Sequence, residues 1–431
     1  MLNKFRLFIP KSNFWKDVFT LTFGTGLAQV IPILISPILT NFYSPVDFGN
    51  YGLYFSCTMV LSVLICGRYE MAILLPEGDK ERANILALCL IIALIITAIL
   101  FVISGIWGHE ISSLFKNDFL SEFIYYIPVS VLLIGLLQGL NFWFNQKKQY
   151  KDLSVSRVNR SLTTSGFGLF FGVFNFKNLG LIIADLLGQL LSIIYLLFIK
   201  KTFISSIIKS VSLKEIKEAA VRYKDFPKYY VISGLFEKAS SHAPVILLTL
   251  YFSSVEAGFF ALALRVISSP VSLISGSIGD VFRQQASEIY YKEGNCVKIF
   301  NNTLKKLVLI GLPLFLIGFL LIKFLFSYIF GSEWEMAGIY SQIMCVMFFL
   351  QFVISPLSSM IIIAEKQKIG MMTNLVLFSF SYFSFWIAKS FFDSATMAIV
   401  FYVVIYSLKY IVEFLLSFNY SMGYANKQRK L

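Results

Sequence analysis

The sequence is poor in charge: Asp, Glu, Lys and Arg make up only 14% of its 431 residues, whereas 57% are hydrophobic. With a mean hydropathy of +0.74, the chain has too little polar surface to cover a water-soluble globule. This excludes a soluble enzyme or a soluble binding module. Apolar runs of 20 or more residues recur from about residue 18 to residue 420, and they predict an all-α integral membrane protein.

Cysteine and histidine are also scarce, at five and two residues. An odd number of cysteines, most of them in or beside apolar runs, predicts no disulfide framework, and no CxxC spacing or histidine cluster predicts a metal site. We expect the cysteines to be packing residues. Because a Walker motif is missing as well, we expect no nucleotide hydrolysis and no cofactor. The basic N-terminus lacks an apolar core with a cleavage site, so no cleaved signal peptide is expected.

About 20 apolar residues cross the hydrocarbon core as a helix, and this rule predicts twelve transmembrane helices. The fifth is the least apolar, because Arg157, Arg160 and a cluster of Ser and Thr dilute its first part. The predicted limits are 18–41, 50–75, 83–107, 121–145, 156–175, 177–200, 229–252, 256–282, 303–327, 337–363, 370–390 and 395–420.

The distribution of basic residues predicts the orientation of these helices, because Lys and Arg near span ends accumulate on the cytoplasmic side. If the N-terminus is cytoplasmic, 29 of the 37 Lys and Arg residues fall in inside segments, and the outside loops hold only Lys116 and Lys177. We therefore expect both termini in the cytoplasm. The net charge of +13 then belongs mainly to the cytoplasmic face, so nucleic-acid binding is not needed to explain it.

The longest polar gap lies between the sixth and seventh predicted helices. Its Ser212-Leu-Lys-Glu215 pattern is typical of a capping box, and we expect a short amphipathic surface helix after it. The predicted domains are an N-terminal six-helix bundle at 1–200, a cytoplasmic linker at 201–228 and a C-terminal six-helix bundle at 229–431.

An internal repeat supports this division. The segments "LTNFYSPVDFGNYGLY" (39–54) and "LTLYFSSVEAGFFALA" (248–263) share Leu, Thr, Ser, Val, Gly and Leu at a constant offset of 209, and Asp47 aligns with Glu256. Six helices per half is an even number, so the two copies enter the membrane the same way up. The repeat is therefore parallel, with its axis along the membrane normal, and such repeats place their site between the halves.

The chain resembles the multidrug, oligosaccharidyl-lipid and polysaccharide exporter superfamily, and within it the bacterial flippases of undecaprenyl-pyrophosphate-linked oligosaccharides. The resemblance covers nearly the whole chain and rests on the six-plus-six helices and on three segments. These are "FYSPVDFGNYGLY", "FPKYY" and "SSVEAGFFALALRVISSPVSLISGSIGDVFRQQASE". It implies a flippase, not an enzyme, that carries O-antigen (lipopolysaccharide) or capsule repeat units to the outer leaflet of the cytoplasmic (inner) membrane. The expected protein is a monomer that supplies a downstream polysaccharide polymerase.

Arg265 is the most informative charge, because it lies nine residues into the eighth predicted helix, roughly 14 Å deep. Ser268 and Ser272 follow it on the same helical face. Charges at the bilayer centre cost about 2.5 to 3.5 kcal/mol, so they usually face a water-filled cavity or a partner. Two interpretations stay open: Arg265 lines a cavity and contacts an anion, or it pairs with an intramembrane acid such as Asp185.

Lys238 reaches a similar depth in the seventh predicted helix, and together with Arg265 it predicts a basic midplane in the second half. The positions aligned with these two cations in the first half are Gln29 and Ser56. The two halves therefore share a repeated sequence pattern but not these two charges. This difference favours a ligand whose anionic group lies away from the axis that relates the halves. The alternative for Lys238 is an ion pair with Glu237.

Other charged groups are weaker candidates. Arg157 and Arg160 can reach a cavity open to the cytoplasm or snorkel to the interface, and Arg68 and Glu70 are expected at the interface. Lys409 is a further candidate for substrate binding, unless Glu413 at i+4 neutralises it. The candidates for proton or ion coupling are Asp185, His242 and Glu237, and a satisfied polar contact is an equal alternative for the first two.

Two other functions remain as alternatives. A cation-coupled multidrug exporter of the same fold is disfavoured because a cavity for cationic drugs would favour acids, and the predicted midplane is basic. A membrane-embedded glycan polymerase or ligase is disfavoured because the loops are too short to hold acceptor chemistry.

Overall fold

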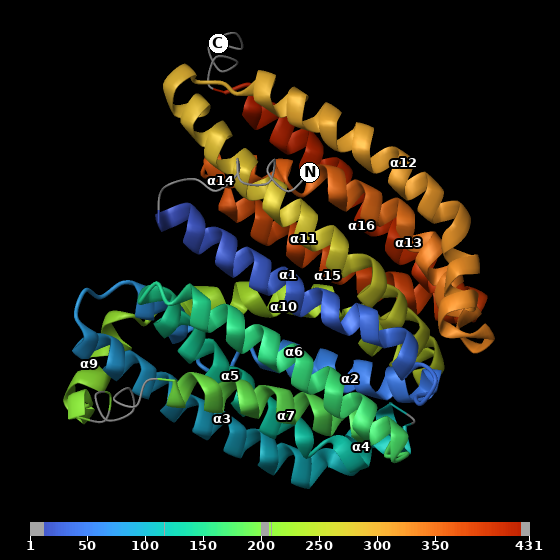
Figure 1. The fold of residues 1–431 in the computed structure, drawn as a ribbon, viewed down its shortest axis with the longest axis horizontal. Coiled ribbons are helices and arrows are strands. Elements are labelled where there is room, and N and C mark those ends of the chain that lie inside the picture. Colours follow the sequence, from blue (N-terminus) through green and yellow to red (C-terminus); the bar gives the residue numbers. More distant parts are fainter. Residues whose placement is uncertain (1–12, 116, 200–206, 208, 424–431) are drawn as a thin grey trace, which may run out of the picture. The chain divides into compact units, whose positions relative to one another are not determined.

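The computed structural model describes residues 13–115, 117–199, 207 and 209–423, and this part of the chain is helical and contains no strand. Figure 1 shows the helices, most of them long. Apart from Lys16, the basic residues of the two terminal segments, on which part of the predicted orientation rests, lie outside the described residues. Lys116, one of the two basic residues predicted in outside loops, lies outside them as well.

The helices follow one another with short connections. The first part of the chain contains α1 (Asn13–Leu39), α2 (Pro45–Leu61), η2 (Tyr69–Leu74), α3 (Asp79–Leu114), α4 (Asp118–Phe123), α5 (Tyr126–Gln146), α6 (Tyr150–Val173), α7 (Lys177–Phe198) and α9 (Leu213–Arg222). The second part contains η3 (Phe226–Val231), α10 (Ile232–Tyr251), α11 (Ser254–Glu293), α12 (Val297–Phe330), η4 (Ser332–Trp334), α13 (Glu335–Ile354), η5 (Leu357–Ser359), α14 (Met360–Ile363), α15 (Gln367–Ile387), η6 (Ala388–Phe392) and α16 (Ala395–Ser421).

Each of the twelve predicted membrane spans overlaps a helix, and the all-α membrane fold is confirmed. Among the described residues, nine helices are long and apolar enough to cross a bilayer. Three other helices coincide with predicted spans but are too short or too polar to be counted among these nine. α2 has only 17 residues, α6 carries two arginines and several Ser and Thr, and α10 carries Glu237 and Lys238. The count of twelve stays a prediction.

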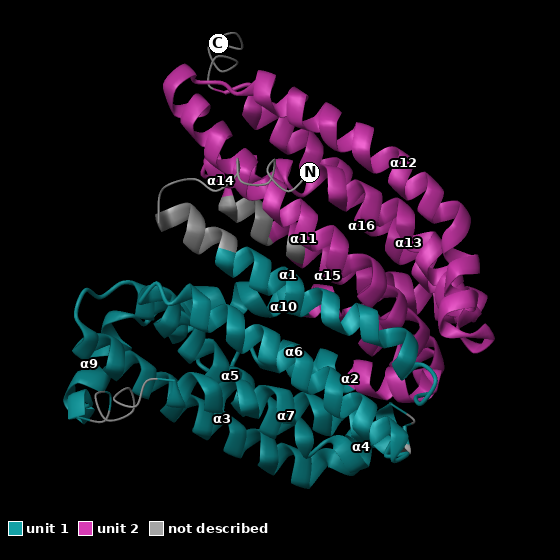
Figure 2. Ribbon diagram, in the orientation of Figure 1, with its two compact units in different colours: residues 1–43, 54–238 teal, residues 44–53, 239–431 magenta. Residues whose placement is uncertain are grey.

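The chain divides into two compact units, coloured separately in Figure 2. Unit 1 consists of residues 1–43 and 54–238, and unit 2 consists of residues 44–53 and 239–431. The first turns of α2 thus belong to the unit that contains α11. The predicted domain limits, 1–200, 201–228 and 229–431, remain predictions.

In unit 1 the polar residues of α6 connect it to its neighbours. Ser154 and Ser161 donate hydrogen bonds to backbone carbonyls of α1, at 2.9 and 2.7 Å, and the hydroxyl oxygens of Ser156 and of Ser192 on α7 are 2.6 Å apart. Small polar residues let helices approach closely and bond across the interface in an apolar medium. The Ser and Thr that weaken the hydropathy of this segment are therefore part of its helix packing.

The linker helix α9 is attached to the start of α3 through Asn84, which is fully buried. The Asn84 amide donates to the carbonyls of Lys80 and Ser210 and to the Glu215 carboxylate, at 2.9, 3.1 and 2.8 Å, and its oxygen accepts from the Ser212 amide at 2.9 Å. Ser212 occupies the N-cap of α9 but its side chain makes no capping hydrogen bond. The predicted capping box is wrong in this respect, because Glu215 binds α3 instead.

The far end of α9 is held by Glu81, an acid of α3. Arg222 pairs with its carboxylate at 2.8 Å, and the Tyr223 hydroxyl donates to the same oxygen at 2.9 Å. Burial of the Tyr223 phenol, together with this hydrogen bond to a carboxylate, raises its pKa. The linker helix therefore packs on α3 at both of its ends.

In unit 2 the internal repeat is reproduced in local structure. α2 begins at Pro45 and α11 at Ser254, which are aligned positions, and both helices start with the same capping bond. The amide of Asp47 donates to the Ser44 hydroxyl at 3.3 Å, and the amide of Glu256 donates to the Ser253 hydroxyl at 3.3 Å. A side-chain oxygen that accepts from an N-terminal amide stabilises a helix by about 1 kcal/mol. The sequence identity between the copies therefore encodes the same helix start.

The aligned glycines of the repeat, Gly49 and Gly258, lie against each other where α2 and α11 approach. A methyl group on Gly49 would overlap the carbonyl oxygen of Ser254, and one on Gly258 would overlap the carbonyl oxygen of Pro45. Because Pro45 and Ser254 are also aligned, the contact is symmetric between the copies. Absence of a side chain at both positions is what allows the two backbones to approach this closely.

We predict that Gly49→Ala and Gly258→Ala each destabilise the protein, because an added methyl group must displace backbone atoms of the opposite helix. Overpacking costs about 1 to 3 kcal/mol and occasionally more. The measurement is the melting temperature and the folded yield in detergent. Gly276→Ala in α11 is the matched control, because no heavy atom lies within 4 Å of its added methyl group. Equal stability of all three variants would contradict the prediction.

Candidate functional site

Arg265 lies on α11 and its guanidinium packs against two aromatic rings of α2. The guanidinium carbon is 5.7 Å from the centre of the Phe48 ring and 5.8 Å from that of Tyr51. These residues all belong to unit 2. The side chain is half-buried, and no acid of the described chain lies within ion-pair distance of it. Arg265 thus has an aromatic environment but no counter-charge among the residues that the structure describes.

Asp185, the acid considered as a partner for Arg265, is bonded within unit 1. The Asp185 carboxylate accepts from Arg160 at 3.3 Å and from the Gln189 amide at 2.7 Å, and the same amide donates to the Ser130 hydroxyl at 3.0 Å. Asp185 is only 3% exposed. One polar network thus joins α6, α7 and α5. Within it, Asp185 is paired with Arg160 and hydrogen-bonded to Gln189.

Arg157, one turn before Arg160 on α6, has a neutral partner. Its guanidinium donates to the Thr25 hydroxyl on α1 at 2.5 Å, and it makes no ion pair with any described residue. The two arginines of α6 therefore differ in their partners. Arg160 has the Asp185 carboxylate as a counter-charge, whereas Arg157 has no acidic partner among the described residues.

Lys409 on α16 forms the ion pair that the spacing allows. Its ammonium lies 2.9 Å from the Glu413 carboxylate, with side chains 19% and 12% exposed, and 4.3 Å from the centre of the Tyr410 ring. Tyr402 and Tyr406 precede it on the same helix, with ring centres 4.4 Å apart. Sequence reasoning missed this tyrosine row, although its spacing of four residues is a helical-face signal.

The remaining candidates lie on α10 and α11. Lys238 is half-buried, and no described acid pairs with it, whereas the neighbouring Glu237 is exposed. His242 is half-buried and Ser268 likewise, and the exposed Ser272 donates to the backbone of its own helix, to the carbonyl of Ser269 at 3.0 Å. That Lys238 and Arg265 face one cavity stays a prediction.

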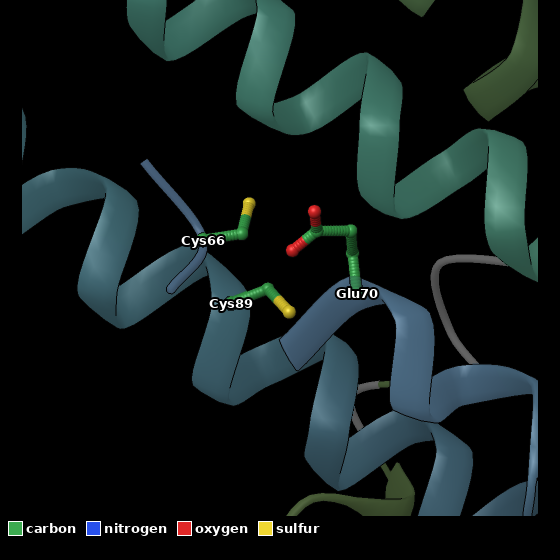
Figure 3. Close-up of side chains that lie close together, drawn as sticks. All are labelled: Cys66, Glu70 and Cys89. Atoms are coloured by element: carbon green, nitrogen blue, oxygen red, sulfur yellow. The ribbon is translucent and has the colours of Figure 1, made fainter. Parts of the chain in front are cut away.

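A second cluster, which sequence reasoning did not find, lies beside α3 in unit 1. Glu70 was expected at the membrane interface, but it is enclosed by protein and only 1% exposed. It pairs with Arg68 at 3.7 Å, and its carboxylate lies near the thiols of Cys66 and Cys89 (Figure 3). The only hint in the sequence was the spacing of Cys66 and Glu70 by four residues.

A family model described as "Polysaccharide biosynthesis protein" matches residues 38–339, more than half of the chain. The chain belongs to this family. Among proteins of curated function no match is found. Solved structures with a similar fold include the lipid II flippase MurJ in an inward closed conformation, with a TM-score of 0.74 and 12% identity over 93% of this chain and 87% of MurJ.

Two further structures share this fold at low identity. One is an inward-facing multidrug resistance MATE family transporter of the MOP superfamily, with a TM-score of 0.63 and 16% identity over 93% of each chain. The other is a MOP superfamily transporter from Pyrococcus furiosus, with a TM-score of 0.50 and 14% identity over 93% of this chain and 94% of that one. The resemblance found in the sequence is thereby confirmed.

We predict that Asp185→Leu destabilises unit 1, because it leaves Arg160 and Gln189 without their shared acceptor. Removal of one partner from a fully buried ion pair costs about 3 to 5 kcal/mol. Because the Arg160 side chain is 32% exposed, the loss should be smaller than that. The measurement is thermal unfolding in detergent. Glu288→Leu, which removes an exposed ion pair with Lys292, is the control and should change stability little; equal losses would contradict the prediction.

Proposed function

We propose that this protein is a flippase that moves an undecaprenyl-pyrophosphate-linked oligosaccharide repeat unit from the inner to the outer leaflet of the cytoplasmic membrane. Membership of a polysaccharide biosynthesis family and a fold like that of the lipid II flippase MurJ support this function. The product would enter surface polysaccharide, as O-antigen or capsule. The transport mechanism would be alternating access, in which the substrate cavity opens to one leaflet at a time.

The observation that carries the proposal is Arg265, a cation in an apolar helix without a described counter-charge. Cation–π contacts with Phe48 and Tyr51 stabilise the guanidinium by about 0.5 to 2 kcal/mol, whereas a charge in mid-membrane costs about 2.5 to 3.5 kcal/mol or more. The rings therefore do not offset the full cost. An anionic group of the substrate, such as a pyrophosphate, would supply the missing counter-charge.

The other cations can now be ranked by their partners. Arg160 and Lys409 are neutralised by acids of their own unit, at 3.3 and 2.9 Å. Arg157 and Lys238 have no acidic partner in the described chain, so with Arg265 they are the best candidates for binding an anion. At the position aligned with Arg265 the first half has Ser56, which is buried, and this difference supports an off-axis anionic ligand.

A multidrug exporter is the second candidate, because MATE family transporters share the fold. The basic candidates on this chain favour an anionic substrate over a cationic drug. The MOP superfamily transporter from Pyrococcus furiosus shows that the charge of the binding pocket can differ between proteins of this fold. The reverse polarity of its pocket is taken to suggest a different function. In the function that we propose, the protein works as a monomer with both termini in the cytoplasm. It delivers its product to a polysaccharide polymerase.

We expect Arg265→Ala to abolish surface glycan while the amount of folded protein in the membrane stays normal, and Arg265→Lys to retain part of it, because lysine keeps the charge. Surface glycan is measured on cells, and protein by immunoblot of membranes. Lys389→Ala is the control, since it also removes a cation over an aromatic ring (Phe252, 5.3 Å) and its ion pair is exposed. If Arg265→Ala merely lowers the amount of folded protein, the residue is structural.

Deletion of the gene tests the substrate class. We expect undecaprenyl-linked repeat units to accumulate on the inner leaflet and surface glycan to be lost, with unchanged sensitivity to cationic drugs. The measurements are mass spectrometry of extracted lipid-linked sugars, surface glycan staining and growth in the presence of drugs. Drug hypersensitivity with intact surface glycan would favour the multidrug exporter and reject the flippase.

A further inference from the structure

The side chains of Cys66, Glu70 and Cys89 lie close together in unit 1, as Figure 3 shows. Cys66 lies in the turn that follows α2, Glu70 is in η2, and Cys89 is on α3. The two sulfur atoms and one carboxylate oxygen all lie within 4.8 Å of one another. The three residues are buried, at 1%, 1% and 3% exposure, so solvent does not compete for these groups.

The turn geometry explains how two residues of one short segment face α3 together. Gly67 and Arg68 both have left-handed backbone conformations, with φ of 57° and 62°. Two successive left-handed residues reverse the direction of the chain between Cys66 and Glu70. This conformation is costly for a residue with a side chain such as Arg68, so the surrounding contacts must hold it.

Glu70 supplies a second and independent observation. Its Oε2 atom is buried and accepts no hydrogen bond within the described chain. A buried polar atom without a partner destabilises a protein, more so when it is charged, and such atoms often mark a missing ion or ligand. The Cys66 thiol, a weak donor, makes a long hydrogen bond to the Gly135 carbonyl at 3.5 Å.

We propose that Cys66, Cys89 and Glu70 bind a Zn²⁺ ion. Two thiolates and a carboxylate are ligands that zinc prefers, with Zn–S distances of about 2.3 Å and a tetrahedral arrangement. Those values place the ligand atoms about 3.8 Å apart, so the present spread of up to 4.8 Å needs a contraction of at most about 1 Å. Two Zn–S bonds and one Zn–O bond form as the ion loses water ligands and the two thiols release their protons to water.

The charges around the site also balance. Zn²⁺ with two thiolates and one carboxylate carries a net charge of −1, and the Arg68 guanidinium lies 3.7 Å from the other oxygen of Glu70. The complete group is therefore neutral, as a buried site requires. A cavity of about 490 Å³ is lined by both cysteines and offers room for a fourth ligand. The bound ion would fix the turn after α2 to α3.

The test uses the full-length protein, purified in detergent under reducing conditions and freed of metal with a chelator. Titration with Co²⁺, a spectroscopic substitute for Zn²⁺, should produce a thiolate-to-metal charge-transfer band that saturates at one equivalent and disappears on addition of Zn²⁺. Cys66→Ser and Cys89→Ser should each abolish the band, and Glu70→Gln should weaken Co²⁺ binding at least tenfold. Cys345→Ser, which removes another buried thiol, should behave as the wild type.

Absence of the band in the wild type, or its persistence in the Cys66→Ser, Cys89→Ser double variant, would overturn the proposal. A second measurement needs no substitution and therefore does not depend on the folding of variants. Zn²⁺ should protect Cys66 and Cys89 of the wild-type protein from alkylation, as measured by mass spectrometry, at least tenfold more than it protects Cys345. Equal alkylation with and without Zn²⁺ would reject the site.

Discussion

A bilayer offers no water to bond the backbone or to solvate a charge, and the organisation of this protein follows from that constraint. Helices satisfy their own amides and carbonyls, which is why a chain with 57% hydrophobic residues forms helices throughout its described part. Because of the same constraint, polar residues within the helices form hydrogen bonds to neighbouring helices. The serines of α6 bond to the neighbouring helices α1 and α7, and Asn84 satisfies four backbone and side-chain groups where the linker helix meets α3.

Charges within the helices show the constraint most clearly, because each needs a partner or a polar cavity. Arg160 and Lys409 each form an ion pair with an acid of their own unit, which compensates their charge. Arg265 has the rings of Phe48 and Tyr51, which compensate part of the cost of its charge. The difference between cations with and without an acidic partner is what separates structural charges from candidates for substrate binding.

The internal repeat shows which features both halves need and which only one half needs. The Ser44 and Ser253 caps and the Gly49 and Gly258 contact are shared, because each copy must start its helix in the same way and pack closely. The charge at the position of Arg265 is not shared. A contact between aligned glycines requires both copies, whereas the anionic ligand that we propose would need a cation on one side alone.

The positions of the helices could be predicted from the sequence, because hydropathy over about 20 residues is a local property. Their limits could not: the span predicted at 50–75 is interrupted after α2 ends at Leu61, and the span predicted at 256–282 lies within the longer α11 (Ser254–Glu293). The repeat was also visible, since its offset is constant. The partners of the charged residues were not, because Arg160 and Asp185 are 25 positions apart and meet only through the packing of α6 on α7. Glu70 is a clear case: its charge predicted an interface position, yet the left-handed turn at Gly67 and Arg68 brings it inside, beside Cys66 and Cys89. The sequence by itself determined where the chain is helical and where it is charged, and only the tertiary structure decided which charges are neutralised, because that depends on which helix faces meet.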